Sequence, residues 1–273
     1  MDLRLGLFTF PYQYLSIETA FCDAKMLGYD YVELWGGRPH AFTYDLLNGD
    51  IDTVNGLVKK YGIPVSIYTP EHNAYPYNYM LGSMRQWEIS MDYFRSSLIA
   101  ARCMGAEYML VSIGHGENIS DCDCKRRLYK SMEYLSKLAE DEGVKIVVEP
   151  LTPYESNHCT SLEDYSKLIF DINSPWIFAM LDMAVPNTQK EMPEDYFSVF
   201  KDKLRHIHLV DNDTVSDSHL IPGEGNIDMK GFIKNTKRWG YNGRATIELV
   251  NRYIDNPTEY YKIAINRIRE LYD

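Results

Sequence analysis

The chain has few of the features that mark a membrane, secreted or nucleic-acid-binding protein. No apolar run approaches the ~18 residues of a membrane span, and the first residues, MDLRLGLFTF, do not have the pattern of a secretory leader. Five cysteines, an odd number, do not suggest a disulfide framework. Together these absences predict a cytoplasmic protein with no membrane partner.

Basic patches and flexible linkers are also lacking. Lys and Arg number 28 against 39 Asp and Glu, a formal net charge of −11, and no stretch gathers the basic residues into a dense patch. Such a surface disfavours nucleic acid as a partner. No tract rich in Pro, Gly and Ser divides the 273 residues, which predicts one domain spanning residues 1–273.

Short runs rich in Val, Ile and Tyr recur along the chain and alternate with segments of helical periodicity. Glycines such as Gly28, Gly62 and Gly105 stand where helices are expected to end. The predicted strands are residues 3–10, 31–36, 63–69, 107–113, 145–149, 177–183, 204–210 and 245–250. Eight such alternations in a chain of this length predict an α/β protein, a (β/α)8 TIM barrel. A doubly wound open sheet is the alternative, but no Gly-x-Gly-x-x-Gly follows the first strand.

Each of the last four predicted strands has an ionisable residue near its carboxyl end. They are Glu149 in KIVVEP, Asp182 in AMLDM, His208 in RHIHLVD and Glu248 in TIELV. Consecutive strands of a closed barrel are neighbours, so these side chains should meet at one mouth of the barrel. Three carboxylates there would repel one another without a partner, and oxygen and imidazole donors suit one divalent cation such as Mn, Mg, Co, Ni or Zn. His206, deeper on the same strand as His208, is expected to support the site rather than to bind the ion.

A cation of this kind can bind the carbonyl and adjacent hydroxyl oxygens of a sugar and stabilise the enediolate formed on proton loss. Glu149 and Glu248 lie on the fifth and eighth strands and could flank the cation as a catalytic acid/base pair. One would remove a proton from one face of a carbon and the other would return it to the opposite face, which is epimerisation. Hydrolysis at several metal ions is the rival chemistry; its extra ligands would be His40, His72 and His115, each equally plausible as a loop histidine or a substrate contact.

Five stretches carry a resemblance that spans nearly the whole chain. They are GGRPHAF (36–42), YTPEHNAYPYNYMLG (68–82), EPLTPYESN (149–157), DSHLIPGEG (217–225) and IELV (247–250). The chain resembles the ketose 3-epimerases of the xylose-isomerase-like barrels, and within them enzymes that act on a ketosamine, a sugar joined through an amine to an amino acid. The resemblance implies one divalent metal, the four ligands named above, a possible homo-oligomer and Glu155 as a sugar-binding residue.

Two positions depart from the family pattern. Val185 and Thr214 stand where related enzymes carry a His and an Arg that touch substrate. A free ketohexose is therefore a less suitable substrate, and His219 could supply a replacement contact or the space could receive an aminoacyl-like tail.

The loops after the second and third strands should form a substrate-binding wall. Its predicted members are Trp35, Arg38, His40, Tyr68, Glu71, Tyr75 and Tyr77, and His115, after the fourth predicted strand, is a further candidate substrate contact. Aromatic faces can pack on a sugar ring or an ammonium group, and Glu71 is the acid that we expect to meet a cationic amine of the substrate. Other activities of the same fold remain open, namely another ketose 3-epimerase, a polyol or hydroxy-acid isomerase, a DNA-repair endonuclease or a non-catalytic sugar-binding barrel.

Overall fold

The computed structural model describes residues 3–72, 76–118 and 121–272 and shows a closed parallel barrel of eight strands. The strands are β1 (Arg4–Phe8), β2 (Tyr31–Gly36), β3 (Val65–Pro70), β4 (Tyr108–Ser112), β5 (Lys145–Glu149), β6 (Ile177–Asp182), β7 (Leu204–Leu209) and β8 (Arg244–Ile247). Each strand pairs with the next, and β1 pairs with β8 through Leu5 and Ala245. This closure confirms the predicted TIM barrel and excludes the open sheet.

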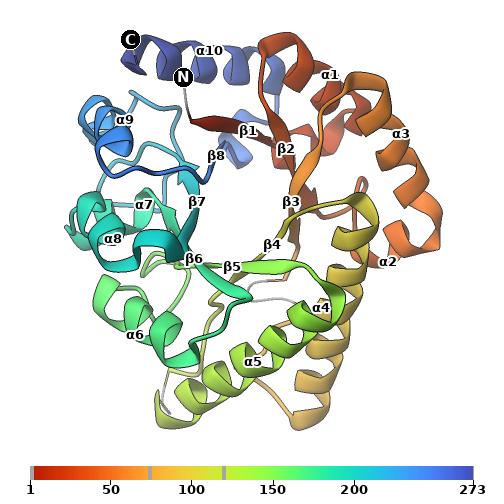
Figure 1. Cartoon of the computed structure of the whole chain (residues 1–273), viewed down its shortest axis with the longest axis vertical. Coiled ribbons are helices and arrows are strands. Elements are labelled where there is room, and N and C mark those ends of the chain that lie inside the picture. Colours follow the sequence, from red (N-terminus) through yellow and green to blue (C-terminus); the bar gives the residue numbers. More distant parts are fainter. Residues whose placement is uncertain (1–2, 73–75, 119–120, 273) are drawn as a thin grey trace.

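The helices surround the barrel as an outer ring (Figure 1). They are α1 (Ile17–Leu27), α2 (Thr43–Asp45), α3 (Ile51–Tyr61), α4 (Met84–Met104), α5 (Asp121–Glu142), α6 (Leu162–Ile172), α7 (Ala184–Gln189), α8 (Pro193–Phe200), α9 (Met229–Arg238) and α10 (Pro257–Tyr272). Short helical turns occupy η1 (Phe10–Tyr14), η2 (Leu46–Asp50), η3 (Lys201–Lys203) and η4 (Asn251–Tyr253). The two termini lie beside each other, since α10 returns to the start of β1 (Figure 1).

Local sequence explains where several elements begin and end. Ser83 and Gln86 form a reciprocal capping box at the start of α4. Gly105 ends that helix in the left-handed conformation, with φ at 76°, which a glycine adopts without the steric cost that a side chain would bring. β1 stops at Phe8, earlier than predicted, because Phe10–Tyr14 turns into a short helix that contains Pro11.

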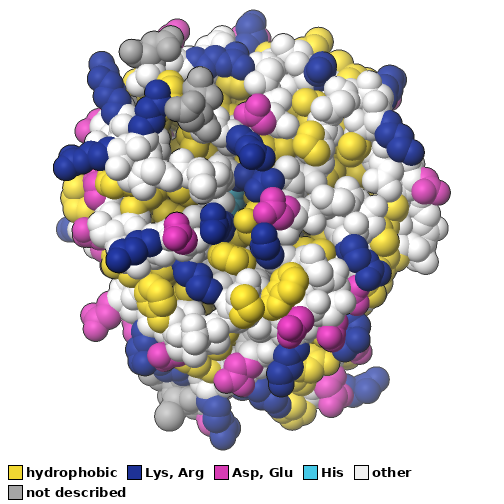
Figure 2. Space-filling model, in the orientation of Figure 1, with side chains coloured by type: hydrophobic (Ala, Val, Ile, Leu, Met, Phe, Trp, Pro, Cys, Tyr) yellow, Lys and Arg dark blue, Asp and Glu magenta, His cyan; other side chains and the backbone are white. Residues whose placement is uncertain are grey.

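Apolar side chains fill both the barrel and the layer between strands and helices. Tyr31, Ile67, Tyr108, Leu110, Val147 and Met180 form a separate buried cluster inside the barrel. The larger cluster packs the outer faces of the strands against the helices. Charged side chains of both signs cover the surface and are interspersed on the face shown in Figure 2. No helix in the described part of the chain is long and apolar enough to span a bilayer.

Candidate active site

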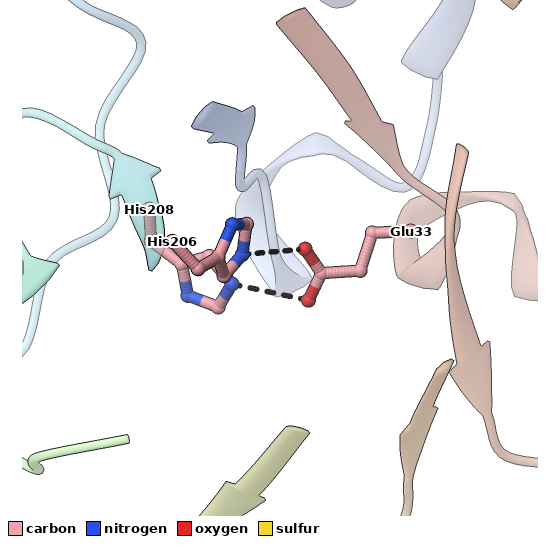
Figure 3. A group of neighbouring side chains, drawn as sticks. All are labelled: Glu33, His206 and His208. Carbon is pink, nitrogen blue, oxygen red and sulfur yellow. Dashed lines mark hydrogen bonds and ion pairs between the residues drawn. The ribbon is translucent and has the colours of Figure 1, made fainter. Parts of the chain in front are cut away.

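The barrel interior holds one fully buried carboxylate, Glu33 on β2. Its Oε2 lies 2.9 Å from Nε2 of His206 and its Oε1 lies 3.1 Å from Nε2 of His208, so each oxygen accepts one imidazole N–H (Figure 3). Although burial by itself raises the pKa of Glu33, the positive charge and N–H groups of His208 and His206 hold it well below its ordinary range. The contact with Glu33 directs Nε2–H of His208 at that carboxylate, so Nδ1 is the ring nitrogen that can bind a metal ion once it gives up its proton.

The other ring nitrogen of His208 faces the carboxylates that end β5, β6 and β8. Nδ1 lies 3.1 Å from Oε1 of Glu149, 3.0 Å from Oε2 of Glu248 and 3.9 Å from Oδ2 of Asp182. One donor atom from each of the four residues lies within 4.8 Å of every other. The structure therefore brings the four predicted ligands together at one point.

The centre of this group lacks the hydrogen bonds that buried polar atoms normally make. Nδ1 of His208 and Oε2 of Glu248 are both buried and have no hydrogen-bond partner among the described residues. Burial lowers the pKa of His208, but the carboxylates of Glu248 and Glu33 outweigh this effect and raise it well above the ordinary value. The site thus attracts positive charge, and its three carboxylate oxygens and one imidazole nitrogen fit a divalent cation.

The outer oxygens of two of these carboxylates are held by neighbouring groups. Ser112 donates its hydroxyl to Oε2 of Glu149 at 2.8 Å, and the backbone N–H of Ala184 donates to Oδ1 of Asp182 at 2.7 Å. Each carboxylate consequently presents its remaining oxygen to His208. Such supporting contacts orient the ligands of a metal site before the ion arrives.

A cavity of about 290 Å³ opens above this group. Phe8, Phe10 and Trp35 form an aromatic wall in which the rings of Phe10 and Trp35 meet edge to face at 4.7 Å. The indole N–H of Trp35 donates to Oε2 of Glu71 at 2.6 Å. The lining includes six carboxylates, from Glu71, Glu149, Glu155, Asp182, Asp217 and Glu248, and no Lys or Arg from the described residues.

Four of the predicted substrate-binding residues line this cavity: Trp35, Glu71, Glu155 and His219. Nε2 of His219 lies 3.5 Å from Oδ2 of Asp182 and 3.8 Å from Oε2 of Glu248, beside the proposed ligands. Burial raises the pKa of Glu155 to about 8, and the negative charges of Asp217 and Glu149 add to the effect.

Four further predicted contacts, Arg38, His40, Tyr68 and His115, lie elsewhere, and none is among the described residues that line the cavity. Arg38 pairs with Asp45 at the surface, at 2.6 Å. His40 contacts the carbonyl oxygen of Leu15 at 2.7 Å.

Tyr68 and His115 also make structural contacts. The hydroxyl of Tyr68 is fully buried and donates to the carbonyl of Ala41 at 2.9 Å. His115 uses Nδ1 to donate to the carbonyl of Gly116 at 2.7 Å. Tyr75 lies outside the described residues, and Tyr77 stacks on Tyr93 with ring centroids 3.7 Å apart.

Two acidic residues of the site were not predicted. Glu33 stands in the middle of YVELWG, and the reasoning that singled out Glu149, a carboxylate within a buried strand, applies to it equally. Asp217 accepts a hydrogen bond from the Thr152 hydroxyl at 2.8 Å and lies near Glu155. It comes from a loop where no local pattern distinguishes it from other polar residues.

The chain matches the family model described as xylose isomerase-like TIM barrel over residues 21–271. It is 40% identical over 270 residues to the fructoselysine 3-epimerases of Shigella flexneri and of an Escherichia coli strain, which covers 98% of this chain and 98% of each relative. A crystal structure of the D-allulose 3-epimerase of a Methylomonas species, in complex with D-allulose, superposes with a TM-score of 0.82 and 17% identity, covering 99% of this chain and 97% of that one. At that identity the structural match concerns the fold.

Proposed function

Because this chain belongs to the xylose isomerase-like TIM barrel family and is an isomerase of its epimerase branch, we propose that it interconverts fructoselysine and psicoselysine. The reaction inverts carbon 3 of the ketose part. Identity of 40% over nearly the full length of two enzymes of that name supports the substrate. Glu149, Asp182, His208 and Glu248 are the proposed ligands of one divalent cation.

The observation that carries the proposal is the unpartnered Nδ1 of His208 among three carboxylates. Nδ1 faces anionic oxygens at 3.0 and 3.1 Å, and so close an approach is favourable only when positive charge lies at that point, as a proton on Nδ1 or as a cation that replaces it. A bound divalent cation would supply that charge and would stabilise the negative oxygens that develop when carbon 3 loses its proton.

Glu149 and Glu248 are the proposed acid/base pair because they reach the same point from β5 and from the end of β8. One carboxylate removes the proton from carbon 3, and the electron pair of the broken C–H bond moves into the enediolate. The other glutamic acid donates a proton to the opposite face, which re-forms the C–H bond with inverted configuration. Proton exchange with water resets the pair, so a deuterium from solvent should appear at carbon 3.

The charges of the cavity favour an amine-bearing substrate over a neutral ketose. Three carboxylates, Glu71, Glu155 and Asp217, line the cavity in addition to the proposed metal ligands, and no described Lys or Arg balances them there. A neutral sugar would bring no positive charge to Glu71 and Asp217, and it would leave Glu155, whose pKa is about 8, protonated at neutral pH. Fructoselysine carries an amine on carbon 1 of the ketose and a second amino group on its lysine part, and ammonium groups would relieve the repulsion.

Glu71 is the proposed contact for one of these ammonium groups. Glu71 follows β3 directly, and the indole of Trp35, near the end of the neighbouring strand β2, holds its carboxylate against the aromatic wall. We expect Glu71→Gln to raise the Michaelis constant for fructoselysine and to leave kcat nearly unchanged. An unaltered Michaelis constant would remove Glu71 from this role.

The test is incubation with fructoselysine in deuterated water with Mn²⁺, followed by NMR of the recovered sugar. Deuterium at carbon 3 together with psicoselysine is the expected result. Fructose and tagatose serve as neutral ketoses in parallel incubations. Exchange with these sugars and none with fructoselysine would instead establish an epimerase of neutral ketoses, and no exchange with any of them would refute the proposal.

A further inference from the structure

His72 lies on the wall of the cavity but belongs neither to the four proposed metal ligands nor to the acid/base pair. It follows directly after β3 and Glu71, and its residue surface is only 3% exposed. The edge of the Phe94 ring packs against the imidazole with centroids 4.9 Å apart, and Tyr79 lies on another side at 6.3 Å. The ring is therefore held in one orientation.

One ring nitrogen of His72 is an acceptor. The backbone N–H of Ser112 on β4 donates to Nε2 of His72 at 3.1 Å. An imidazole nitrogen that accepts a hydrogen bond bears no proton, so the proton of the neutral ring is on Nδ1. Burial lowers the pKa of His72 to about 3, which keeps the ring neutral at any pH where the enzyme would work.

The protonated nitrogen has no acceptor among the residues that the structure describes. Nδ1 of His72 is buried and makes no hydrogen bond with any described residue. A buried N–H left in this state costs about 1–3 kcal/mol, so an unsatisfied group of this kind calls for an explanation, such as a role in the reaction or a bound partner.

His72 is also connected to the reaction centre through Ser112. Ser112 donates its backbone N–H to His72 and its hydroxyl to Oε2 of Glu149. Ser112 and Glu149 are also partners in the β4–β5 register. The His72 ring is thus fixed relative to a proposed acid/base residue. A sugar atom bound by His72 would have a defined distance from Glu149.

We propose that Nδ1–H of His72 donates a hydrogen bond to a hydroxyl oxygen of the bound ketose and so positions carbon 3 between Glu149 and Glu248. This inference rests on the proposed function, since it names a contact with the substrate of that reaction. A neutral donor suits the role because it binds a hydroxyl without adding positive charge beside the cation site.

Two substitutions separate this role from a structural one. The amide of His72→Asn can place a donor near the position of Nδ1, whereas His72→Gln extends to the position of Nε2 and offers no donor at Nδ1. We expect His72→Gln to lower kcat/KM for fructoselysine about tenfold, the effect of losing one hydrogen bond, and His72→Asn to recover most of that loss. Equal losses in the two variants, with both shown to be folded by thermal melting, would overturn the proposal.

A second measurement uses the unaltered His72 and does not need turnover. In ¹H–¹⁵N spectra of Glu248→Gln protein labelled in its histidine rings, His72 should show a proton on Nδ1, and this proton should move downfield when fructoselysine is added. A proton on Nε2, or an Nδ1 proton that is unmoved by fructoselysine, fructose and tagatose, would also overturn it. Deuterium exchange by the wild-type enzyme tests the proposed function by itself. If the wild type exchanges deuterium at carbon 3 and the His72 measurements fail, only the His72 contact is refuted.

Discussion

Two groups of acidic and imidazole side chains share His208, and they differ in how far their hydrogen bonds are satisfied. Around Glu33, each carboxylate oxygen accepts a hydrogen bond from one histidine. Around Nδ1 of His208, three carboxylates approach and no hydrogen bond forms at that nitrogen. Both groups have donor atoms close enough for one ion. The presence of suitable residue types therefore does not distinguish a metal site from a structural cluster, whereas unsatisfied donor atoms do.

Depth in the barrel accounts for the difference. Glu33 is 0% exposed, while Glu149, Asp182 and Glu248 retain 8%, 5% and 7% exposure and line the cavity. A carboxylate with no access to solvent must be paired within the fold, or its charge would be too costly. Carboxylates at the rim can receive an ion and a substrate from solution.

The largest expected effect is on the rim group. Glu248→Gln removes a charge and a proton carrier, and we expect kcat to fall by roughly a thousandfold, the usual scale for general acid/base catalysis. The unfolding free energy should change little or rise. Glu259→Gln is the matched control because Glu259 is half exposed and pairs only with Lys262 in the surface pairs described. Turnover of Glu248→Gln close to the wild-type rate would mean that the acid/base pair lies elsewhere.

The second prediction concerns the interior group, where the change should act on stability. Glu33→Gln leaves His206 and His208 without their shared carboxylate, and we expect a loss of about 3 kcal/mol in unfolding free energy. Cation affinity should fall about 10- to 100-fold because His208 loses the contact that orients it. Denaturant titration and calorimetry measure the two quantities. Glu107→Gln is the control and should cost less, because this carboxylate, which pairs with Lys145 and Arg244, is 40% exposed.

Removal of the proposed cation with a chelator tests whether the group around Nδ1 of His208 binds metal. With free cation at about a hundred times its dissociation constant, binding stabilises the native protein by about 2.7 kcal/mol. Removal of the cation with EDTA should lower Tm by roughly 5 °C in a chain of this size. Activity should disappear and return when Mn²⁺ is added back. If the EDTA-treated protein kept its Tm and its full activity, the reaction would not require a bound cation.

The smallest expected effect is on the pH dependence of the metal-free protein. Glu155 has a pKa of about 8 in the folded chain against 4.5 in the reference state, so the folded chain binds more protons between these values. This contribution to stability is complete below pH 4.5 and is lost as the pH rises through 8. Glu155→Gln should remove most of that pH-dependent loss, because the amide does not titrate. Parallel stability curves for the two proteins would contradict the assignment.

Much of the fold could be predicted from local patterns. β2 and β5 begin and end at the predicted residues, because a buried parallel strand is a short run of β-branched and aromatic residues bounded by turn formers. The meeting of four side chains at one point could also be predicted from the sequence, because strand order in a closed barrel decides which residues are neighbours. These are Glu149, Asp182, His208 and Glu248. The resemblance to known epimerases, rather than any spacing, indicated the substrate class.

The substrate wall was predictable only in part. Trp35 and Tyr68 lie near the carboxyl ends of neighbouring strands, but Trp35 pairs with Thr69 and lines the cavity, whereas Tyr68 is one position earlier in the register and fully buried. Sequence alone determined the barrel and which residues end its last four strands, because alternation of apolar runs and helical periods is a local property of the chain. Only the tertiary structure decided that Glu33 is satisfied, that Nδ1 of His208 is not, and that His72 presents an unpaired N–H. Hydrogen-bond satisfaction depends on the distances and directions of atoms from segments far apart in the chain, which no local pattern specifies.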